Sequence, residues 1–524
     1  MKQGVFKYIF VLAFIVLLII TYIVFYDDED ETSTVEDQTS TVSTLITDLR
    51  LGISEFDTLN PIVTNNKNVK EISRLIFDSL VTVSSNYGLE YGLATEIAKS
   101  DNLNYIITLR EGVEWQDGTE FTAQDVKFTI DTIKTSFSSS VYGENLSAVT
   151  GFEIIDTYTI KITLSEEVEF FEYNLTFPIL SQSFFEDEDF INTEKNNYII
   201  GTGMFEITEK TDNSITLSKN ENYWNEDKDS LITEINITLY DTIGEEYTAF
   251  KSGYIDIMDI TTTDVENYVG SLGYKTIEYE DRSVDFLCFN VEDEILSDAN
   301  IRKAIALYLE KSNIVANLGS GYTVANFLFS SDSLFYDSKL DVSTDSEEAD
   351  NLLIESGWTY SGGVWVKDGT TLKFTILVDA SNSTRLTVAN LIAEQLANHG
   401  IQVTVTSYSS SNYSNSVDNR NYDAIISGIT TGYSPKLSTL FIGDNLANYN
   451  NSTVNEILES ANSLNDYNTL REKYLEVYDE YLNDFPYVFL YRETDSVIYN
   501  QSLCGTIEPT SYSIFYNIEK WYRQ

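Results

Sequence analysis

From residue 49 onward, two patterns of hydrophobic and polar positions alternate along the chain. Apolar residues at every second position predict half-buried strands, and apolar residues spaced three and four apart predict amphipathic helices. The predicted strands are LRLGI (49–53), YIITLR (105–110), YTIKITL (158–164), SITLSKN, EINITLY, VDFLCFNV and LKFTILV. The predicted helices are VKEISRLIFDSLV (69–81), ANIRKAIALYLEKSNIV (299–315), STRLTVANLIAEQLANHG (383–400) and NTLREKYLEVYDEYLND. Because strands and helices interleave throughout, the fold class is α/β or α+β.

The last of these helices carries a stripe of large side chains on one face: Leu470, Tyr474, Val477, Tyr478 and Tyr481. Such a stripe can belong to a cofactor box, but it is much more often the face that packs on a core. We therefore expect core packing here.

The amino-terminal stretch YIFVLAFIVLLIITYIVFY (8–26) is uncharged and nearly all apolar. At about 1.5 Å per residue it spans roughly 28 Å, close to the thickness of the hydrocarbon core of a bilayer. Lys2 and Lys7 precede it and DDEDE (27–31) follows it, which predicts the amino terminus inside the cell and the rest outside. A cleaved signal peptide is the alternative, but the run exceeds a usual signal-peptide core and no A-x-A-like site follows. We expect an uncleaved, single-pass transmembrane anchor.

Residues 27–48, with the stretch TSTVEDQTSTVST, are acidic, rich in Ser and Thr and without hydrophobic periodicity. This composition predicts a flexible stalk between the anchor and the folded part. The protein is then expected at the cell membrane, with the bulk of the chain extracellular.

Charge is the outlying feature of the composition. Lys and Arg number 32 against 83 Asp and Glu, a formal net charge of −51 over 524 residues. Such a field repels phosphate backbones, which excludes nucleic acid as an expected partner. We interpret most of this charge as solubilising surface; a preference for cationic ligands is the alternative, and composition does not decide between them.

The two cysteines, Cys288 and Cys504, form neither a disulfide framework nor a CxxC pair. Whether they pair with each other depends on a distance that the sequence does not give. Two free thiols are our default expectation.

Residues that could support catalysis are few. The single histidine, His399, lies in the last turn of a predicted helix, where a structural role is expected. With one histidine in the chain, His-based zinc sites and HExxH are excluded. No GxSxG occurs, since GITTG (428–432) has Thr430 at its centre, and no P-loop occurs. A carboxylate pair, as in glycosidases, remains the one catalytic option, but with 83 acids its signal is weak. We predict no catalytic residue, no resident metal and no cofactor.

The acidic stretch LREGVEWQDGTEFTAQDV (109–126) looks at first like a chemical site. Asp117-Gly118 is a turn signal, and Thr122 with Asp125 three residues later has the spacing of a helix capping box. The carboxylates are thus explained by solvent, turn and cap, and we interpret the run as architectural.

The same run, extended to LREGVEWQDGTEFTAQDVKFTI, resembles the signature of the extracytoplasmic solute-binding proteins of family 5. These are the peptide- and nickel-binding components of ABC importers, and their usual pattern reads roughly LR-(D/E)-G-V-x-W-H-D-G-x-P-x-T-A-x-D-V-x-(F/Y). Here Gln116 stands for the usual His, and Phe121 occupies the slot after the usual Pro. Further similar segments follow in the family's order from about residue 49 to 524: LGISEFDTLNP, LIFDSLV, GTGMFEITE with ITLSKNENYWN, FKSGYIDI, and FNVEDEILSDANIRKAIALYLEKSNIV.

The resemblance implies an α/β fold of the periplasmic-binding-protein type II, a two-lobe clamp with an extra inserted α+β domain. The ligand is expected between the lobes, which close on it by hinge motion. The two crossings between lobes would lie near Glu278 and Tyr491. The implied divisions are 49–84, 178–279 and 488–524 for the first lobe, 85–177 for the inserted domain, and 280–487 for the second lobe.

One departure from the family bears on the ligand. Peptide-binding members hold the ligand's amino terminus with an Asp in a pattern like G-W-x-A-D-Y-x-(D/E)-P, and the matching stretch here is GITTGYSP (428–435). Gly432 stands where that Asp would be, and a buried ammonium without an anionic partner is costly. Another acid substitutes, or the ligand is not a free-amine peptide, or the alignment is shifted by one residue; these three interpretations stay open.

The expected ligand-binding residues are Thr430, Thr431, Gly432 and Tyr433, with Tyr491 at a crossing. Arg302, at a position that matches the family, is expected to pack a helix rather than touch ligand. Trp115 and Trp224 are expected to be core aromatics. The placement of His399 argues against direct nickel ligation but not against a chelated complex.

Taken together, these features predict a membrane-tethered extracellular binding protein that captures a small solute, with peptide as the leading class. It would deliver the solute to an ABC permease and ATPase complex, and it would act as a monomer. A ligand-sensing or chaperone-like surface protein without a transporter, and a carboxylate-based surface hydrolase, are the alternatives.

Overall fold

The computed structural model of the protein describes residues 46–186, 188–260, 271, 273–462, 464 and 466–524. The predicted anchor (8–26) and most of the predicted stalk (27–48) lie outside the described residues. Among the helices within the described ranges, none combines the length and the apolar character needed to cross a bilayer.

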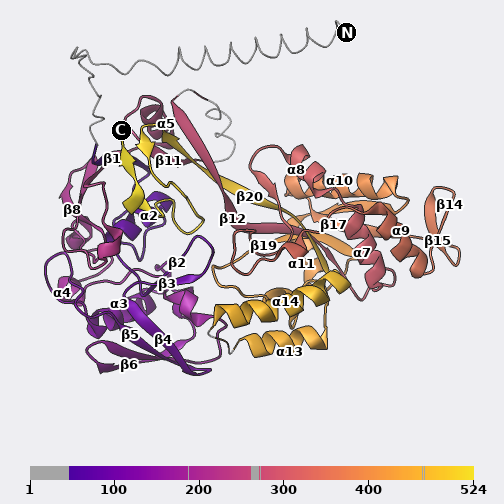
Figure 1. The fold of residues 1–524 in the computed structure, drawn as a ribbon, viewed down its shortest axis with the longest axis horizontal. Helices are drawn as coiled ribbons and strands as arrows, with labels where there is room; N and C mark the ends of the chain where they lie inside the picture. Colours follow the sequence, from indigo (N-terminus) through magenta and orange to yellow (C-terminus); the bar gives the residue numbers. More distant parts are fainter. Residues whose placement is uncertain (1–45, 187, 261–270, 272, 463, 465) are drawn as a thin grey trace, which may run out of the picture. The chain divides into compact units, whose positions relative to one another are not determined.

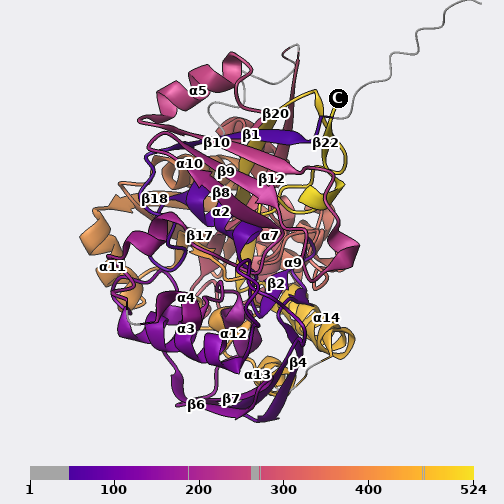
Figure 2. The ribbon, with the colours of Figure 1, turned by 90° about the vertical axis from the view of Figure 1, so that its left-hand side faces the viewer.

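The first sheet has the strand order β1-β10-β9-β8, with β1 and β10 parallel and the other pairs antiparallel. Figure 2 shows its strands side by side. In β1 the residues Leu49, Leu51 and Ile53 are buried, as the alternating pattern predicts. The strands and nearby helices are β1 (Asp48–Ser54), α2 (Lys67–Ile76), β8 (Phe205–Lys210), β9 (Ser214–Lys219), β10 (Glu234–Tyr240) and α5 (Ile243–Lys251).

A second, fully antiparallel sheet has the order β4-β5-β7-β6, and α3 packs on β6. The predicted capping box is confirmed: Thr122 is the N-cap of α3, and its backbone N–H donates to Asp125 Oδ2 over 2.9 Å. The buried side chains of this sheet and of the first sheet form one continuous hydrophobic core. The elements here are β2 (Val81–Val83), β3 (Leu89–Tyr91), β4 (Ala94–Asp101), β5 (Asn104–Leu109), α3 (Ala123–Thr135), β6 (Val149–Asp156), β7 (Thr159–Leu164) and α4 (Gln182–Phe185).

The third sheet has the order β11-β20-β12-β19-β17-β18, and β13 also pairs with β20. Its long central strands β12 and β20 run side by side in Figure 1 and are antiparallel. The first part of β12, up to Glu280, pairs with β20, whereas the part from Ser283 onward also pairs with β19. The strands are β11 (Ile257–Ile260), β12 (Tyr274–Phe289), β13 (Tyr322–Val324), β17 (Lys373–Asp379), β18 (Gln402–Tyr408), β19 (Ala424–Thr430) and β20 (Tyr487–Asn500).

Helices cover both faces of this sheet. On β12, Phe286 and Cys288 belong to one core and Leu287 and Phe289 to another, which explains the unbroken apolar run FLCF. The stripe of α14, from Leu470 to Tyr481, is buried in the first of these cores, so the expected core packing is confirmed. The helices are α7 (Ala299–Tyr308), α8 (Lys311–Leu318), α9 (Ser346–Glu355), α10 (Ser383–Asn398), α11 (Ser410–Asp418), α12 (Ser438–Phe441), α13 (Ser452–Ala461) and α14 (Tyr467–Asp484).

Small strands complete the described fold: β14 (Thr359–Ser361), β15 (Val364–Lys367) and β16 (Thr370–Thr371) form one small sheet, and β21 (Leu503–Cys504) pairs with β22 (Tyr522–Arg523).

The helix predicted over 69–81 is too long at its carboxyl end. Helix α2 stops at Ile76, Phe77 is extended, and β2 begins at Val81. The cause is tertiary: Asp78 accepts hydrogen bonds from Trp224 Nε1 over 2.8 Å and from Thr202 Oγ1 over 3.0 Å. Trp224 is half-buried and packs against the edge of the hydrophobic core, with the Arg110 guanidinium 4.2 Å from its ring centre, so the expectation of a core position is met in part. Trp115 is buried as expected.

The helix predicted over 299–315 is interrupted. Helix α7 ends before Leu309 and α8 begins at Lys311. At the break, Glu310 N–H donates to Gln395 Oε1 over 2.8 Å, and the Lys311 ammonium is buried against Ala325 O and Asn326 Oδ1. These long-range contacts outweigh the helical pattern.

Two stretches that carry the family resemblance meet in the first sheet. Gln116 Oε1 accepts from Gly201 N–H over 2.8 Å, and Gln116 Nε2 donates to Phe205 O over 2.8 Å. Gly201 itself lies against the end of α2, where an added Cβ would lie 1.9 Å from Ile76 O. The glycine is therefore required by a close approach of two backbones.

Replacing Gly201 with Ala is expected to destabilise the protein by about 3 kcal/mol, since the extra methyl meets backbone that cannot rotate away. Gly244→Ala is the matched control, because the nearest atom to its added Cβ is 3.9 Å away and the site is helical. The control should be neutral or gain less than about 1 kcal/mol. Urea denaturation of both variants measures this, and equal midpoints would contradict the proposed contact.

Burial also gives a pH dependence. Desolvation lowers the pKa of Lys311 from its usual 10.5 to about 8. Between these values the unfolded chain holds a proton that the folded chain lacks, so stability should rise with pH through this window. Relative to Lys311→Met, the wild type should gain about 3 kcal/mol from pH 8 to pH 10.5, measured by urea denaturation at several pH values. Parallel pH curves for the two proteins would show that Lys311 is not desolvated.

Candidate ligand-binding site

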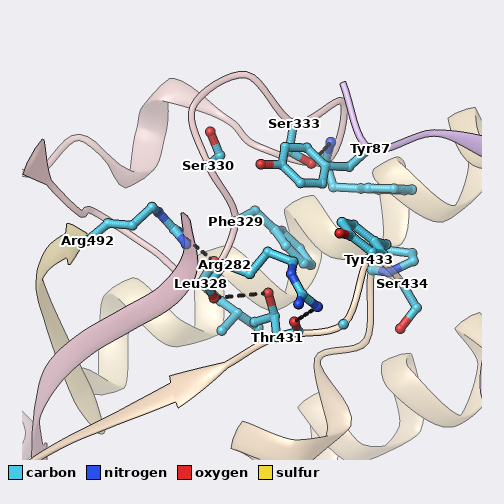
Figure 3. Close-up of a pocket in the computed structure, with 13 residues that line it drawn as sticks. Tyr87, Arg282, Leu328, Phe329, Ser330, Ser333, Thr431, Tyr433, Ser434 and Arg492 are labelled. Carbon is cyan, nitrogen blue, oxygen red and sulfur yellow. Dashed lines mark hydrogen bonds between the residues drawn. The ribbon is translucent and has the colours of Figure 1, made fainter. Parts of the chain in front are cut away.

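A small recess, with a cavity volume of about 20 Å³, is formed where segments far apart in sequence come together. Tyr87 comes from the turn between β2 and β3, Arg282 from β12 and Arg492 from β20, as Figure 3 shows. The other lining residues lie in two loops, one after β13 and one after β19: Leu328, Phe329, Ser330, Ser333 and Phe335, then Thr431, Gly432, Tyr433, Ser434 and Pro435.

A break in strand register places Arg282 in this recess. Glu280 pairs with Thr494 and Val284 with Arg492, so Asp281, Arg282 and Ser283 stand opposite Glu493 alone. Such a bulge re-aims side chains that a regular strand would point to alternate faces.

The loop after β19 is fastened to the bulge. Thr431 N–H donates to Arg282 O over 3.1 Å, and Arg282 Nη1 donates back to Thr431 O over 2.9 Å. One residue earlier, the hydroxyls of Thr430 and Ser283 lie 2.9 Å apart. The backbone of the loop is thus tied to the backbone of the bulge, and Thr431 O holds the Arg282 guanidinium.

Tyr433 belongs to a stack of alternating cations and aromatic rings. The Arg282 guanidinium lies 4.6 Å from the Tyr433 ring centre, the Tyr433 and Tyr512 rings meet edge to face at 5.1 Å, and Arg74 lies 4.7 Å from the Tyr512 ring. The Tyr433 hydroxyl donates to Ser511 O over 2.8 Å. Burial raises the pKa of Tyr433, although both arginines oppose the shift, so the hydroxyl stays a proton donor at neutral pH.

Arg492 forms an ion pair and hydrogen bonds within the protein. Its Nε lies 3.1 Å from Glu280 Oε2, and its Nη2 donates to Leu328 O over 2.8 Å. Burial lowers its pKa and the Glu280 carboxylate opposes that shift. The residue fixes the loop after β13 and is electrically balanced by Glu280.

Of the five residues expected at the site, the structure brings Thr431, Gly432 and Tyr433 together in the recess, and it places Thr430 and Tyr491 outside its lining. Gly432 contributes no side chain, and the nearest atom to an added Cβ there, Ser434 Oγ, is 3.7 Å away. A ligand role for any of the five stays a prediction.

Tyr491, itself buried, instead contacts a half-buried ion pair. Its hydroxyl donates to Asp285, which also accepts from Arg385 Nε over 2.8 Å and Nη2 over 2.7 Å. Gly428 allows this approach, since an added Cβ would lie 1.8 Å from Asp285 Oδ1. Desolvation by burial and the Asp285 charge raise the pKa of Tyr491, so it donates as a neutral phenol.

The sequence interpretation missed Tyr87, Arg282 and Arg492. A usable signal for Arg282 exists: it is the one cation in the run YEDRSVD, close to the predicted crossing at Glu278. Nothing in sequence spacing marks Tyr87 or the loop after β13.

The other candidates are structural. His399 is the C-cap of α10, and its ring stacks on Tyr308 at 4.2 Å, away from the recess. Arg302 is buried and donates to backbone carbonyls, among them Asp484 O over 2.8 Å, which confirms its packing role. Both cysteines are free, as expected. Within the described ranges, no group of three or more His, Cys, Asp or Glu residues could hold a metal ion.

Comparison with known proteins defines the class. The family described as bacterial extracellular solute-binding proteins, family 5, middle part, matches residues 88–451. The chain therefore belongs to this family, which consists of binding proteins and not of enzymes. Its mixed α/β fold matches that of two-lobe periplasmic binding proteins.

Individual relatives have low sequence identity to this chain but align with it over most of its length. The oligopeptide-binding protein AppA of Bacillus subtilis (strain 168) is 24% identical over 91% of this chain and 91% of its own length. OppA of the same organism is 23% identical over 87% of this chain and 89% of its own length. Among solved structures, the periplasmic murein tripeptide binding protein MppA in its unliganded open form has a TM-score of 0.78 at 18% identity, covering 91% of this chain and 97% of that one. NikZ from Campylobacter jejuni, in complex with Ni(L-His), has a TM-score of 0.56 at 22% identity, covering 91% of this chain and 99% of that one.

Removing the charge of Asp285 should destabilise the fold, because Arg385 would lose its carboxylate partner in a site where their side chains are 23% and 14% exposed. We expect Asp285→Asn to cost about 2 kcal/mol. The control Tyr491→Phe keeps the ion pair and loses one hydrogen bond, at about 1 kcal/mol. Chemical denaturation measures both, and a control that costs more than Asp285→Asn would show that the ion pair is not the dominant contact.

Proposed function

We propose that this family 5 solute-binding protein captures a peptide in the recess between β12, β20 and the loop after β19, for an ABC importer. The observation that carries the proposal is family membership over most of the folded part, joined to a recess lined by distant segments. The curated relatives AppA and OppA are named oligopeptide-binding proteins, which supports peptide as the solute. Aromatic rings with serine and threonine hydroxyls line the recess, a composition suited to a small organic ligand.

The mechanism we propose is clamp closure about β12 and β20. The first lobe would comprise 49–84, 178–279 and 488–524, with 85–177 inserted, and the second 280–487. The bulge between Glu280 and Val284 supports a hinge there, because a register break is where a strand pair bends.

The proposed lobes meet through an apolar cluster, in which Val83, Tyr173 and Tyr512 share a core with residues of the second lobe, and through polar contacts. Tyr433 donates to Ser511 O, Leu334 N–H donates to Asn86 O over 3.0 Å, and Lys99 Nζ donates to Asn462 O over 3.0 Å. A change in these contacts is what opening and closing would require, so ligand affinity can shift the balance between open and closed states.

We further propose that residues 8–26 anchor the chain in the membrane and that 27–48 form the tether, with the protein acting as a monomer beside its permease and ATPase. The support is the apolar run, its charge flanks and the acidic stalk. An anchored receptor is not lost to the medium, and the tether raises its local concentration near the permease.

The experiment starts from membranes. The full chain should be released by detergent and not by high salt, and it should then bind pools of peptides of about two to nine residues. Binding should raise the stability by RT ln(1+[L]/Kd), about 2.7 kcal/mol at a hundredfold excess over Kd, measured as a thermal shift.

Two comparison ligands are used: Ni²⁺ mixed with histidine, and glucose alone. Mass spectrometry should show that the bound peptide is recovered chemically unaltered. Release by salt alone would refute the anchor. A shift with either comparison ligand and with no peptide pool would refute peptide capture.

A further inference from the structure

We propose that the recess recognises a carboxylate through Arg282, so that the ligand is a peptide or acylated amino acid held by its acidic end and needs no free amine. The inference rests on the proposed function, since it assumes that the recess holds the solute. The recess would then present a positive charge to the ligand, whereas the family pattern has an Asp, and so a negative charge, at the position of Gly432.

The charge of the recess is the first observation. Its lining includes Arg282 and Arg492 and, among the described residues, no Asp or Glu. This occurs in a chain whose net charge is −51. A cationic lining on an acidic protein is a local feature that the average composition does not explain.

The two arginines differ in whether their charge and their N–H donors are already used within the protein. Arg492 is paired with Glu280 and donates to Leu328 O and Phe327 O, so its charge is balanced. For Arg282, the described residues provide one side-chain hydrogen bond, from Nη1 to Thr431 O, and no carboxylate ion pair. Its Nε–H and Nη2–H edge is the fork that matches a carboxylate in two parallel hydrogen bonds.

That same fork is used elsewhere in this protein. Arg385 binds Asp285 through Nε and Nη2, at 2.8 and 2.7 Å. Arg282 is held by Thr431 O on one side and the Tyr433 ring on the other, which leaves this edge free to meet a ligand. Figure 3 shows the guanidinium between these two residues.

An ammonium would find no partner here. Gly432 brings no carboxylate, the Glu280 carboxylate is taken by Arg492, and Asp281 does not line the recess. The Arg282 guanidinium, which has no carboxylate partner among the described residues, would repel a second cation. Tyr87, Phe329 and Phe335 offer apolar surface for a side chain, and Ser330 and Ser333 offer hydroxyls for amide groups.

The test uses the full chain in detergent and one peptide pool in four forms: free termini, amino-terminally acetylated, carboxyl-terminally amidated, and blocked at both ends. Calorimetry or thermal shift gives the affinities. Acetylation should change the affinity by less than about threefold, and amidation should weaken it at least tenfold, since amidation removes the charge that Arg282 binds.

Variants assign the effect to Arg282. Arg282→Gln should weaken binding of acidic-ended pools at least tenfold and leave the affinity for amidated pools unchanged, and Arg282→Lys should retain part of the discrimination. Arg420→Gln is the matched control, because Arg420 pairs with exposed Asp444 away from the recess and should bind as the wild type does.

The outcomes separate the two proposals. If peptides bind but acetylation abolishes binding and amidation is tolerated, the carboxylate inference is wrong and peptide capture stands. If no form of the pool binds, peptide capture fails and the inference fails with it. The comparison of the four peptide forms uses the wild-type protein alone. The inference can therefore be refuted even if the Arg282→Gln variant does not fold.

Discussion

The antiparallel pairing of β12 with β20 is the constraint on which the rest of the structure depends. The first part of this pair adjoins β11, and the second part carries β19 and, through it, β17 and β18. Between the two parts the register slips, and Arg282 lies in that slip. Because Thr431 is bonded to Arg282 in both directions, the same register break also fixes the loop after β19 that lines the recess.

The chemistry of the recess follows from how positive charges are distributed around this bulge. Arg492 and Arg385 each meet a carboxylate, Glu280 and Asp285, and serve to hold strands and loops together. Arg282 meets a carbonyl and a ring instead. Buried ion pairs contribute position more than net stability, so two of the three arginines define geometry and the third keeps its charge available.

The sequence predicted the secondary structure correctly where contacts between residues close in sequence determine it. The strands at 49–53 and 158–164, the capping box of Thr122 and Asp125, and the buried stripe of α14 follow from periodicity and spacing. It failed where long-range contacts decide, as at the break between α7 and α8. The site was only partly predictable for the same reason, since the bond from Arg282 to Thr431 joins residues 149 positions apart and no periodicity encodes it.

An acidic protein can still bind an acidic ligand, because the two charges act over different distances. At physiological salt the field of exposed carboxylates is screened within about 8 Å, so the net charge of the surface slows the approach of an anion more than it weakens the bound state. Inside the recess, Arg282 is already fixed by Thr431 and Tyr433, and little side-chain entropy remains to be lost on binding. A preorganised, uncompensated guanidinium therefore determines which end of a ligand the recess favours, while the acidic surface chiefly affects how fast that ligand arrives.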